Sequence, residues 1–108
     1  MIDWSQVDEL KDEMGDGFDE VVEVFLDEVK EGLARLDGTA SAEKIASDLH
    51  FLKGAALNLG FEEFASLCDQ GETLANARQA EKVDLDQVAL SYERSLEAFT
   101  TGLQLRAA

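Results

Sequence analysis

The 108 residues fit one domain over residues 1–108, and the formal net charge is −15, from 24 acidic and 9 basic residues. Such a charge repels nucleic-acid phosphates and anionic membrane surfaces, so neither is expected as a partner. A single cysteine excludes an internal disulfide and the multi-cysteine zinc sites. No apolar run approaches the roughly 18 residues of a membrane span and no signal peptide is recognisable, so we expect a cytoplasmic protein.

The spacing of apolar residues and the absence of proline predict an all-α fold that begins with a short helix over residues 3–14. Asp3 or Ser5 can cap this helix, because both side chains accept hydrogen bonds from backbone N–H groups that have no partner inside the helix. After a glycine-containing break, a long amphipathic helix is expected over residues 17–37, with Asp16 as its N-cap.

Three further amphipathic helices are predicted in the rest of the chain, over residues 42–59, 61–78 and 85–105. Ser41 is the expected N-cap of the first, and Asp84 forms with Gln87 a pair like a capping box at the start of the last. Four long amphipathic helices joined by short connections indicate an antiparallel four-helix bundle. The short N-terminal helix would lie across one end of this bundle as a lid.

His50 is the only histidine, and it lies one position beyond the apolar stripe of the helix over residues 42–59. Lys53 and Gly54 share its side of the helix, because residues three and four positions apart are neighbours on a helix surface. A glycine inside a helix costs about 1 kcal/mol relative to alanine, which suggests that something must approach the backbone closely at Gly54. A lone histidine on a helix is usually a solvated side chain, so its neighbours carry the functional interpretation.

Phosphoryl transfer is the chemistry that suits these residues. A neutral imidazole is a nucleophile near neutral pH, and phosphoryl transfer needs an in-line approach and neutralisation of charge. Gly54 would allow a partner's carboxyl phosphate to reach the ring of His50, and Lys53 would help to hold the transferred group. An acceptor bonded to the other ring nitrogen would fix the tautomer. Glu72 on the facing helix is the candidate for this role, and Gln70 is the alternative.

Residues 50–60 resemble the signature of histidine-containing phosphotransfer (HPt) domains. In that signature a histidine is followed at fixed spacing by an apolar residue, Lys, Gly, two small residues, another apolar residue and Gly. This sequence meets each defined position. The continuation with Phe64, Cys68 and Glu72 also resembles the family's next helix. Gly71 departs from the pattern, since a larger apolar residue is common there.

The resemblance implies a four-helix-bundle phosphocarrier that exchanges a phosphoryl group on His50 with aspartates of response-regulator receiver domains. A sensor or hybrid histidine kinase would be a further partner, and the receiver domain would supply Mg²⁺, so that this chain itself needs no cofactor and no metal. The docking surface is expected around His50 and Gly54, with apolar contact from Ala46, Phe51 and Leu57. We expect a monomer. ATP-dependent kinase activity is not expected, because no glycine-rich nucleotide loop is present.

Two alternatives use the same surface. A scaffold that binds or sequesters response regulators would need the docking surface but not the imidazole, and the N-terminal phospho-accepting domain of a chemotaxis-type kinase would look the same in sequence. Other classes fit less well. A carboxylate di-metal bundle needs Glu-x-x-His on two helices, but Ser47 stands where the glutamate before His50 should be. A catalytic Cys-His pair would have to use Cys68, which lies on an apolar stripe.

Overall fold

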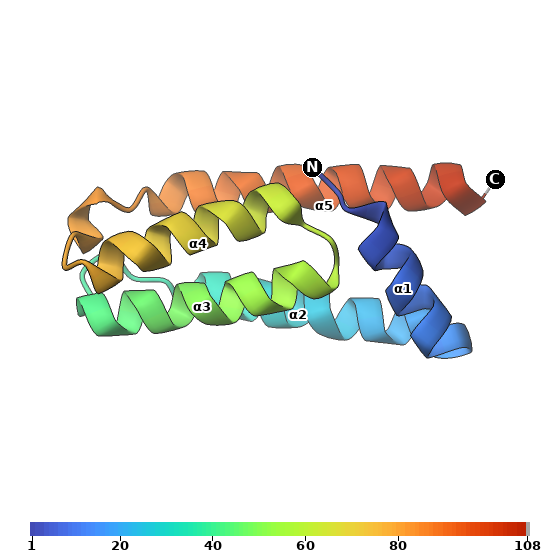
Figure 1. Cartoon of the computed structure of the whole chain (residues 1–108), viewed down its shortest axis with the longest axis horizontal. Helices are drawn as coiled ribbons and strands as arrows, with labels where there is room; N and C mark the ends of the chain where they lie inside the picture. The colour runs from blue at the N-terminus through green and yellow to red at the C-terminus, as the bar shows by residue number, and fades with distance from the viewer. Residues whose placement is uncertain (108) are drawn as a thin grey trace.

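A computed structural model describes residues 1–107 of the chain, which fold almost entirely into helices. Helices α2 to α5 form an elongated bundle and α1 lies across one end of it, in a molecule of 46 × 20 × 20 Å (Figure 1). The expected all-α bundle with a short lid helix is therefore confirmed. In chain order the elements are α1 (Trp4–Met14), η1 (Gly15–Gly17), α2 (Phe18–Arg35), α3 (Ala42–Asn58), α4 (Glu62–Asn76), η2 (Ala80–Lys82) and α5 (Leu85–Ala107), where η marks a single turn of 3₁₀ helix.

Three of the expected helix caps are present. The Asp3 carboxylate accepts from the backbone N–H groups of the first turn of α1, and the Ser41 hydroxyl accepts from the first turn of α3. The Asp84 carboxylate accepts from the N–H of Gln87 at 3.0 Å, at the start of α5. These local hydrogen bonds fix where the helices begin, as the sequence predicts.

Other predicted boundaries are wrong by one or two residues. Asp16 does not cap α2, because it lies inside the η1 turn, which closes with a hydrogen bond from the N–H of Phe18 to the carbonyl of Gly15. The helix α2 therefore begins at Phe18, after Gly17. The helix α4 ends at Asn76, before Arg78, whose φ of 60° lies in the left-handed region. A backbone in that conformation cannot continue a right-handed helix.

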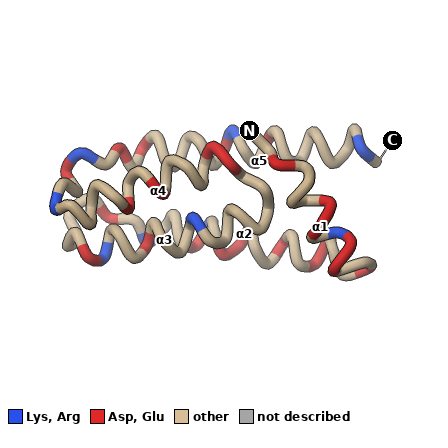
Figure 2. The backbone as a smooth tube through the Cα atoms, viewed as in Figure 1, with Lys and Arg blue, Asp and Glu red and all other residues tan. Residues whose placement is uncertain are grey.

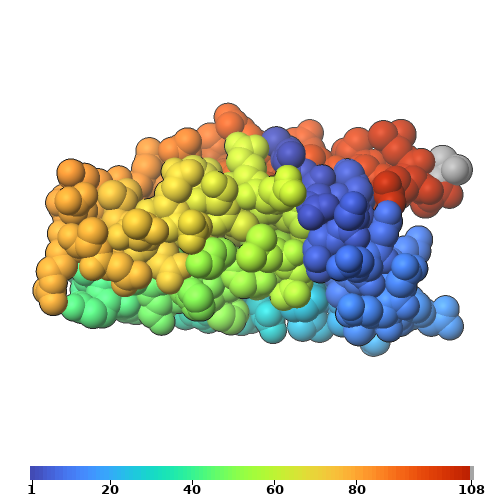
Figure 3. Space-filling view, in the orientation of Figure 1, coloured from blue at the N-terminus to red at the C-terminus, as the bar shows by residue number. Residues whose placement is uncertain are grey.

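The helices α3 and α4 pack closely along their length, and Gly71 of α4 leaves room for Leu49 of α3 to approach its backbone. A Cβ atom at Gly71 of α4 would lie 2.8 Å from Cδ1 of Leu49 of α3, which is closer than side chains pack. Ala56 and Ala75 are buried on the same two helices. Both helices face the viewer in Figure 3, where their side chains meet along the middle of the molecule. This close spacing brings polar groups at the edge of the two helices within hydrogen-bonding distance.

The lid helix α1 is held by Trp4. Its indole ring is stacked on Phe99 of α5, with ring centroids 6.0 Å apart and an interplanar angle of 4°. The Arg106 guanidinium of α5 also packs against the indole ring of Trp4, with its Cζ atom 4.8 Å from the ring centroid. Gly102 leaves the space for the indole, because a side chain there would overlap it. Trp4 is thus the anchor of the lid.

The N-terminal segment also fastens the tight turn between α3 and α4. The N–H of Asp3 donates to the carbonyl of Gly60 at 2.7 Å, and the N–H of Glu62 donates to the carbonyl of Met1 at 3.1 Å. Gly60 has a φ of 72°, and a Cβ atom there would lie 2.5 Å from the Asp3 carbonyl oxygen. The last glycine of the segment 50–60 therefore has a structural role.

Candidate functional site

His50 lies in the middle of α3 with its ring turned to solvent. Its side chain is 68% exposed, whereas Leu49 and Leu52 on either side of it are completely buried. The two leucines fix the rotation of α3 about its axis. The imidazole is therefore presented on a rigid helix, where a second molecule can reach it.

Glu72 of α4 contacts the ring of His50, as expected. The distance between Glu72 Oε2 and His50 Nδ1 is 3.0 Å. In the neutral ring, the tautomer that this carboxylate favours carries its proton on Nδ1 and donates it to Glu72. The lone pair then lies on Nε2, the nitrogen that does not contact Glu72.

Lys53 joins this pair through the second oxygen of Glu72. Its Nζ donates to Glu72 Oε1 at 2.9 Å and to Asp69 Oδ1 at 3.1 Å. The hydrogen bond from Lys53 lowers the pKa of Glu72, and the hydrogen bonds to Glu72 and then Asp69 raise the pKa of Lys53. Glu72 is thus an anion and Lys53 a cation at neutral pH. The four side chains form a continuous chain from Asp69 through Lys53 and Glu72 to His50.

Asp69 is a member of this cluster that the sequence reasoning missed. Asp69 and Glu72 are three residues apart and therefore lie on one side of α4, as His50 and Lys53 do on α3. That spacing is the signal that could have revealed it. Gln70, the alternative partner of His50, points elsewhere: its amide donates to Ser66 Oγ of its own helix at 3.4 Å, and it is two residues from Glu72, about 200° around the helix.

Gly54 lies next to this cluster, one turn after His50, and nothing in the described part of the chain explains it. A Cβ atom there would meet no atom within 4 Å. At two other glycines the place of a Cβ atom is already occupied, by the Leu49 side chain at Gly71 and by the backbone of Asp3 at Gly60. The bare backbone at Gly54 therefore faces open space beside the imidazole, which suits the close approach of another molecule.

The expected docking residues fall into two groups. Phe51 and Leu57 are 41% and 50% exposed, and the Arg35 guanidinium of α2 lies 5.3 Å from the centre of the Phe51 ring. Ala46 was expected on this surface, but it is buried, at 6% exposure. It lies seven residues before Lys53 and therefore on the same side of α3, from which Lys53 reaches Asp69 and Glu72 of α4. Ala46 therefore belongs to the core.

Comparison with known protein families matches residues 20–107 to the Hpt domain. The chain belongs to the Hpt domain family. It is similar to the phosphorelay intermediate protein YPD1 of Candida albicans, with 27% identity over an alignment of 104 residues that covers 91% of this chain and 56% of that protein. The chain thus spans about half the length of the curated relative. No solved structure matches the chain.

Other reactive or hollow places in this Hpt domain lie apart from the cluster. Cys68 is fully buried, and burial raises the pKa of its thiol to about 12, so it is held as an unreactive thiol. Among residues 1–107, no three histidine, cysteine or acidic side chains are grouped so that they could hold a metal ion. Across the same residues, no helix has the length and apolar character needed to cross a membrane.

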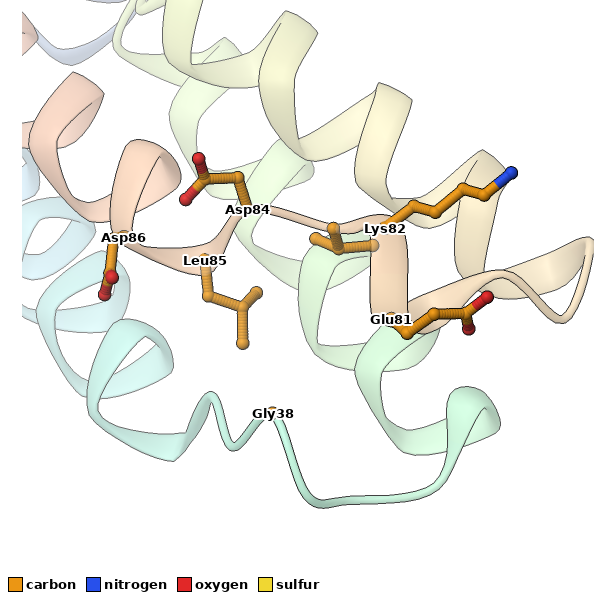
Figure 4. A pocket seen from close by; sticks show the side chains of 7 residues that line it. Gly38, Glu81, Lys82, Asp84, Leu85 and Asp86 are labelled. Carbon is orange, nitrogen blue, oxygen red and sulfur yellow. The ribbon is translucent and has the colours of Figure 1, made fainter.

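A hollow of about 550 Å³ lies at the end of the bundle where the α2–α3 connection approaches the start of α5 (Figure 4). Its walls are Gly38 and residues 81–86. In Figure 4 the side chains of Glu81, Lys82 and Asp84 point in different directions, so the hollow does not gather polar groups around one point. In the cluster around His50, by contrast, hydrogen bonds connect Asp69, Lys53 and Glu72 to the exposed imidazole.

Proposed function

We propose that this Hpt domain is a histidine phosphotransfer protein of a two-component phosphorelay, which carries a phosphoryl group on His50 to and from receiver-domain aspartates. The observation that carries the proposal is the contact of Glu72 with Nδ1 of an imidazole that is 68% exposed. That contact leaves the other ring nitrogen as the nucleophile. The name of the Candida albicans relative, a phosphorelay intermediate protein, supports the same function.

The transfer step follows from the tautomer. The lone pair on Nε2 of His50 attacks the phosphorus of an aspartyl phosphate, so that a P–N bond forms while the P–O bond to the aspartate breaks. The aspartate leaves as a carboxylate. The ring keeps its proton on Nδ1 and becomes cationic, and the Glu72 carboxylate, 3.0 Å away, stabilises that charge. The reverse step returns the phosphoryl group to a receiver.

Lys53 and Gly54 serve this step in different ways. The ammonium group of Lys53 donates to Glu72 and Asp69. Because it has three N–H donors, it can direct one toward a phosphoryl group on His50 and still donate to at least one of the two carboxylates. Gly54 keeps the backbone bare where the receiver must approach. Charge neutralisation and access are the two requirements of phosphoryl transfer that the protein itself can meet.

The partners proposed for this surface are receiver domains, which would bring Mg²⁺, and a sensor or hybrid histidine kinase. Phe51 and Leu57 would give the apolar contact around His50. We propose that residues 1–108 act as a single domain, as a monomer and in the cytoplasm. The formal charge of −15 supports a protein partner with a basic surface rather than a nucleic acid.

Mixing the protein with phosphorylated receiver domains tests the function. Loss of phosphate from the receiver and its appearance on the wild-type chain are expected, whereas a His50→Gln chain should accept none. Binding to the receiver, measured by calorimetry, should survive His50→Gln because the docking surface is unchanged. Equal loss of receiver phosphate with both chains would contradict the proposal.

A scaffold function is the alternative that the same experiment separates. A scaffold binds the receiver with or without the imidazole and takes no phosphate from it. Tight binding by both chains, with no phosphate on either, would therefore replace the carrier function by the scaffold.

A further inference from the structure

Beside the His50 cluster, a groove of about 390 Å³ runs between α3 and α4. Its walls are formed by Lys53, Leu57, Glu62, Ala65, Ser66 and Asp69. On a helical wheel, Lys53 and Phe51 lie on opposite sides of His50. The groove therefore flanks the imidazole on the α4 side, while Phe51 flanks it on the α2 side, next to Arg35.

Small side chains create the hollow. Ala65 is buried, at 4% exposure, and with Ser66 it leaves room where larger residues of α4 would fill the space. Leu57 is 50% exposed and forms an apolar wall on α3. Leu57 also lies one turn after Gly54, on the side of α3 that carries His50. An apolar side chain that enters the groove can belong to the same molecule that reaches the imidazole.

The rim of the groove is acidic. Glu62 is exposed at the start of α4, and the Asp69 side chain is 60% exposed. The one cation at the rim, Lys53, is already paired with both Asp69 and Glu72. The charge that remains at the rim is negative, in a chain whose net charge is −15. A basic side chain of a partner would therefore be attracted to the edge of this groove.

We propose that the groove receives an apolar side chain of the receiver domain that docks over His50, with a lysine or arginine of the same receiver paired to Glu62 at the rim. This inference rests on the proposed phosphotransfer function and adds to it a criterion for the partner. A receiver that fits must carry an exposed apolar residue next to a basic one, within reach of its phosphorylated aspartate. An apolar anchor in a small pocket is the usual centre of binding energy in a protein interface.

Two variants test the groove, each with a matched control. Ser66→Trp fills the hollow, whereas Ser66→Ala removes the hydroxyl and fills nothing. Glu62→Lys reverses the rim charge, whereas Glu63→Lys makes the same change on an exposed neighbour that does not line the groove. Circular dichroism checks the helix content of each chain. If Ser66→Trp does not fold, the Glu62→Lys and Glu63→Lys pair decides the outcome.

Each chain is given two phosphoryl donors. Phosphoramidate is small and needs no docking, so its rate with each groove variant should stay within about twofold of wild type. Transfer from a phosphorylated receiver should need about tenfold more receiver for half-maximal rate in Ser66→Trp and Glu62→Lys, because a central anchor or its charge partner is lost. The two controls should behave as wild type.

The outcomes separate the inference from the function on which it rests. If Ser66→Trp and Glu62→Lys need the same receiver concentration for half-maximal rate as the wild type, the proposed role of the groove is overturned. The phosphotransfer function would stand, because His50 is still phosphorylated normally. Failure of the wild-type chain to accept phosphate from either donor would overturn the phosphotransfer function itself. Equal weakening by Glu62→Lys and Glu63→Lys would show general charge attraction, and would also overturn the pairing at the rim.

Discussion

Glu72 connects the two functional neighbours of the site, because one carboxylate oxygen contacts His50 and the other accepts from Lys53. Lys53 is the main cause of the lowered pKa of Glu72. The contribution of this carboxylate to stability is therefore present above its ordinary pKa of 4.5 and is lost as the pH falls through the lower folded-state value. The contribution of Lys53, whose pKa is raised, is present below 10.5 and is lost as the pH rises through its higher folded-state value.

Replacement of Lys53 by methionine should raise the pKa of Glu72, because the ammonium group that favours the ionised carboxylate is removed. The carboxyl carbon shift of Glu72, followed by NMR from neutral to acidic pH, measures this directly. The control is Lys44→Met, since Lys44 pairs with Asp48 and not with the cluster. An identical Glu72 titration in wild type and Lys53→Met would show that the ion pair does not set its pKa.

Gly54→Ala should both stabilise the fold and lower the rate of phosphoryl transfer from a receiver. The new methyl group meets no atom within 4 Å, and alanine in a helix is favoured over glycine by about 0.5–1 kcal/mol. The same methyl group stands where we propose that a receiver approaches, so transfer from a phosphorylated receiver should slow while the rate of reaction with phosphoramidate is unchanged.

Gly32→Ala in α2 is the matched control for that experiment. A Cβ atom at Gly32 would lie 2.7 Å from Cδ2 of Leu52, so alanine should destabilise the fold there. Thermal unfolding of the two variants should therefore shift in opposite directions. A Gly54→Ala protein that transfers as fast as wild type would contradict the access role of the glycine.

The residues of the candidate site could be predicted from sequence where they share a helix. His50, Lys53 and Gly54 are related by the spacing of one helix, and Glu72 was expected from the facing helix. Gln70 could not be excluded, because the rotation of α4 about its axis depends on tertiary packing. The burial of Ala46 and the role of Asp69 depend on the distance between α3 and α4, which no local pattern determines.

At the scale of the elements, the spacing of α3 and α4 is set by Gly71. Gly71 allows Leu49 to fill the space over the α4 backbone, with Val83 on the other side. Leu49 directly precedes His50, and Gly71 directly precedes Glu72. Leu49 therefore fills the space that a larger residue at position 71 would occupy in the family pattern. The packing of Leu49 on Gly71 holds the imidazole and the carboxylate at their observed distance.

Gly71→Leu should separate the two helices and destabilise the fold by about 1–3 kcal/mol, as overpacking does in a filled core. For a chain of this size, that lowers the midpoint of thermal unfolding by about 4–8 °C per kcal/mol. Reaction of His50 with phosphoramidate should also slow, because Glu72 moves away from Nδ1. An unchanged unfolding midpoint would show that the space over Gly71 is not needed.

The helices themselves were largely predictable, because their signals are local. Asp3, Ser41 and Asp84 cap the helices that they were expected to cap. The η1 and η2 turns were not predicted, since 3₁₀ turns lack a distinctive pattern of apolar residues. The antiparallel bridge between Ile2 and Phe61 joins residues far apart in sequence, and such contacts follow from the assembled fold.

At the scale of the whole molecule, negative charge dominates the surface. Figure 2 shows acidic residues along the length of the molecule and fewer basic ones between them. The few ion pairs include Asp8 with Arg106, which joins α1 to α5. A net charge of −15 on a small protein repels itself and opposes the compact state.

Added salt should therefore stabilise the protein. Between about 10 mM and about 150 mM NaCl, the screening length falls from about 30 Å to about 8 Å, so repulsion across the molecule is weakened while close pairs are kept. The unfolding midpoint should rise by a few degrees. KCl should give the same rise, since the effect depends on ionic strength; a fall in the midpoint would mean that attractive pairs outweigh the net repulsion.

Intact mass after incubation with phosphoramidate shows whether His50 accepts a phosphoryl group without help from any partner, which is what a phosphocarrier requires. We expect that the wild-type chain gains one phosphoryl group, that acid removes it, and that His50→Gln gains none. A wild-type chain that is folded and stays unmodified, or a His50→Gln chain that gains the same acid-labile group, would contradict this expectation.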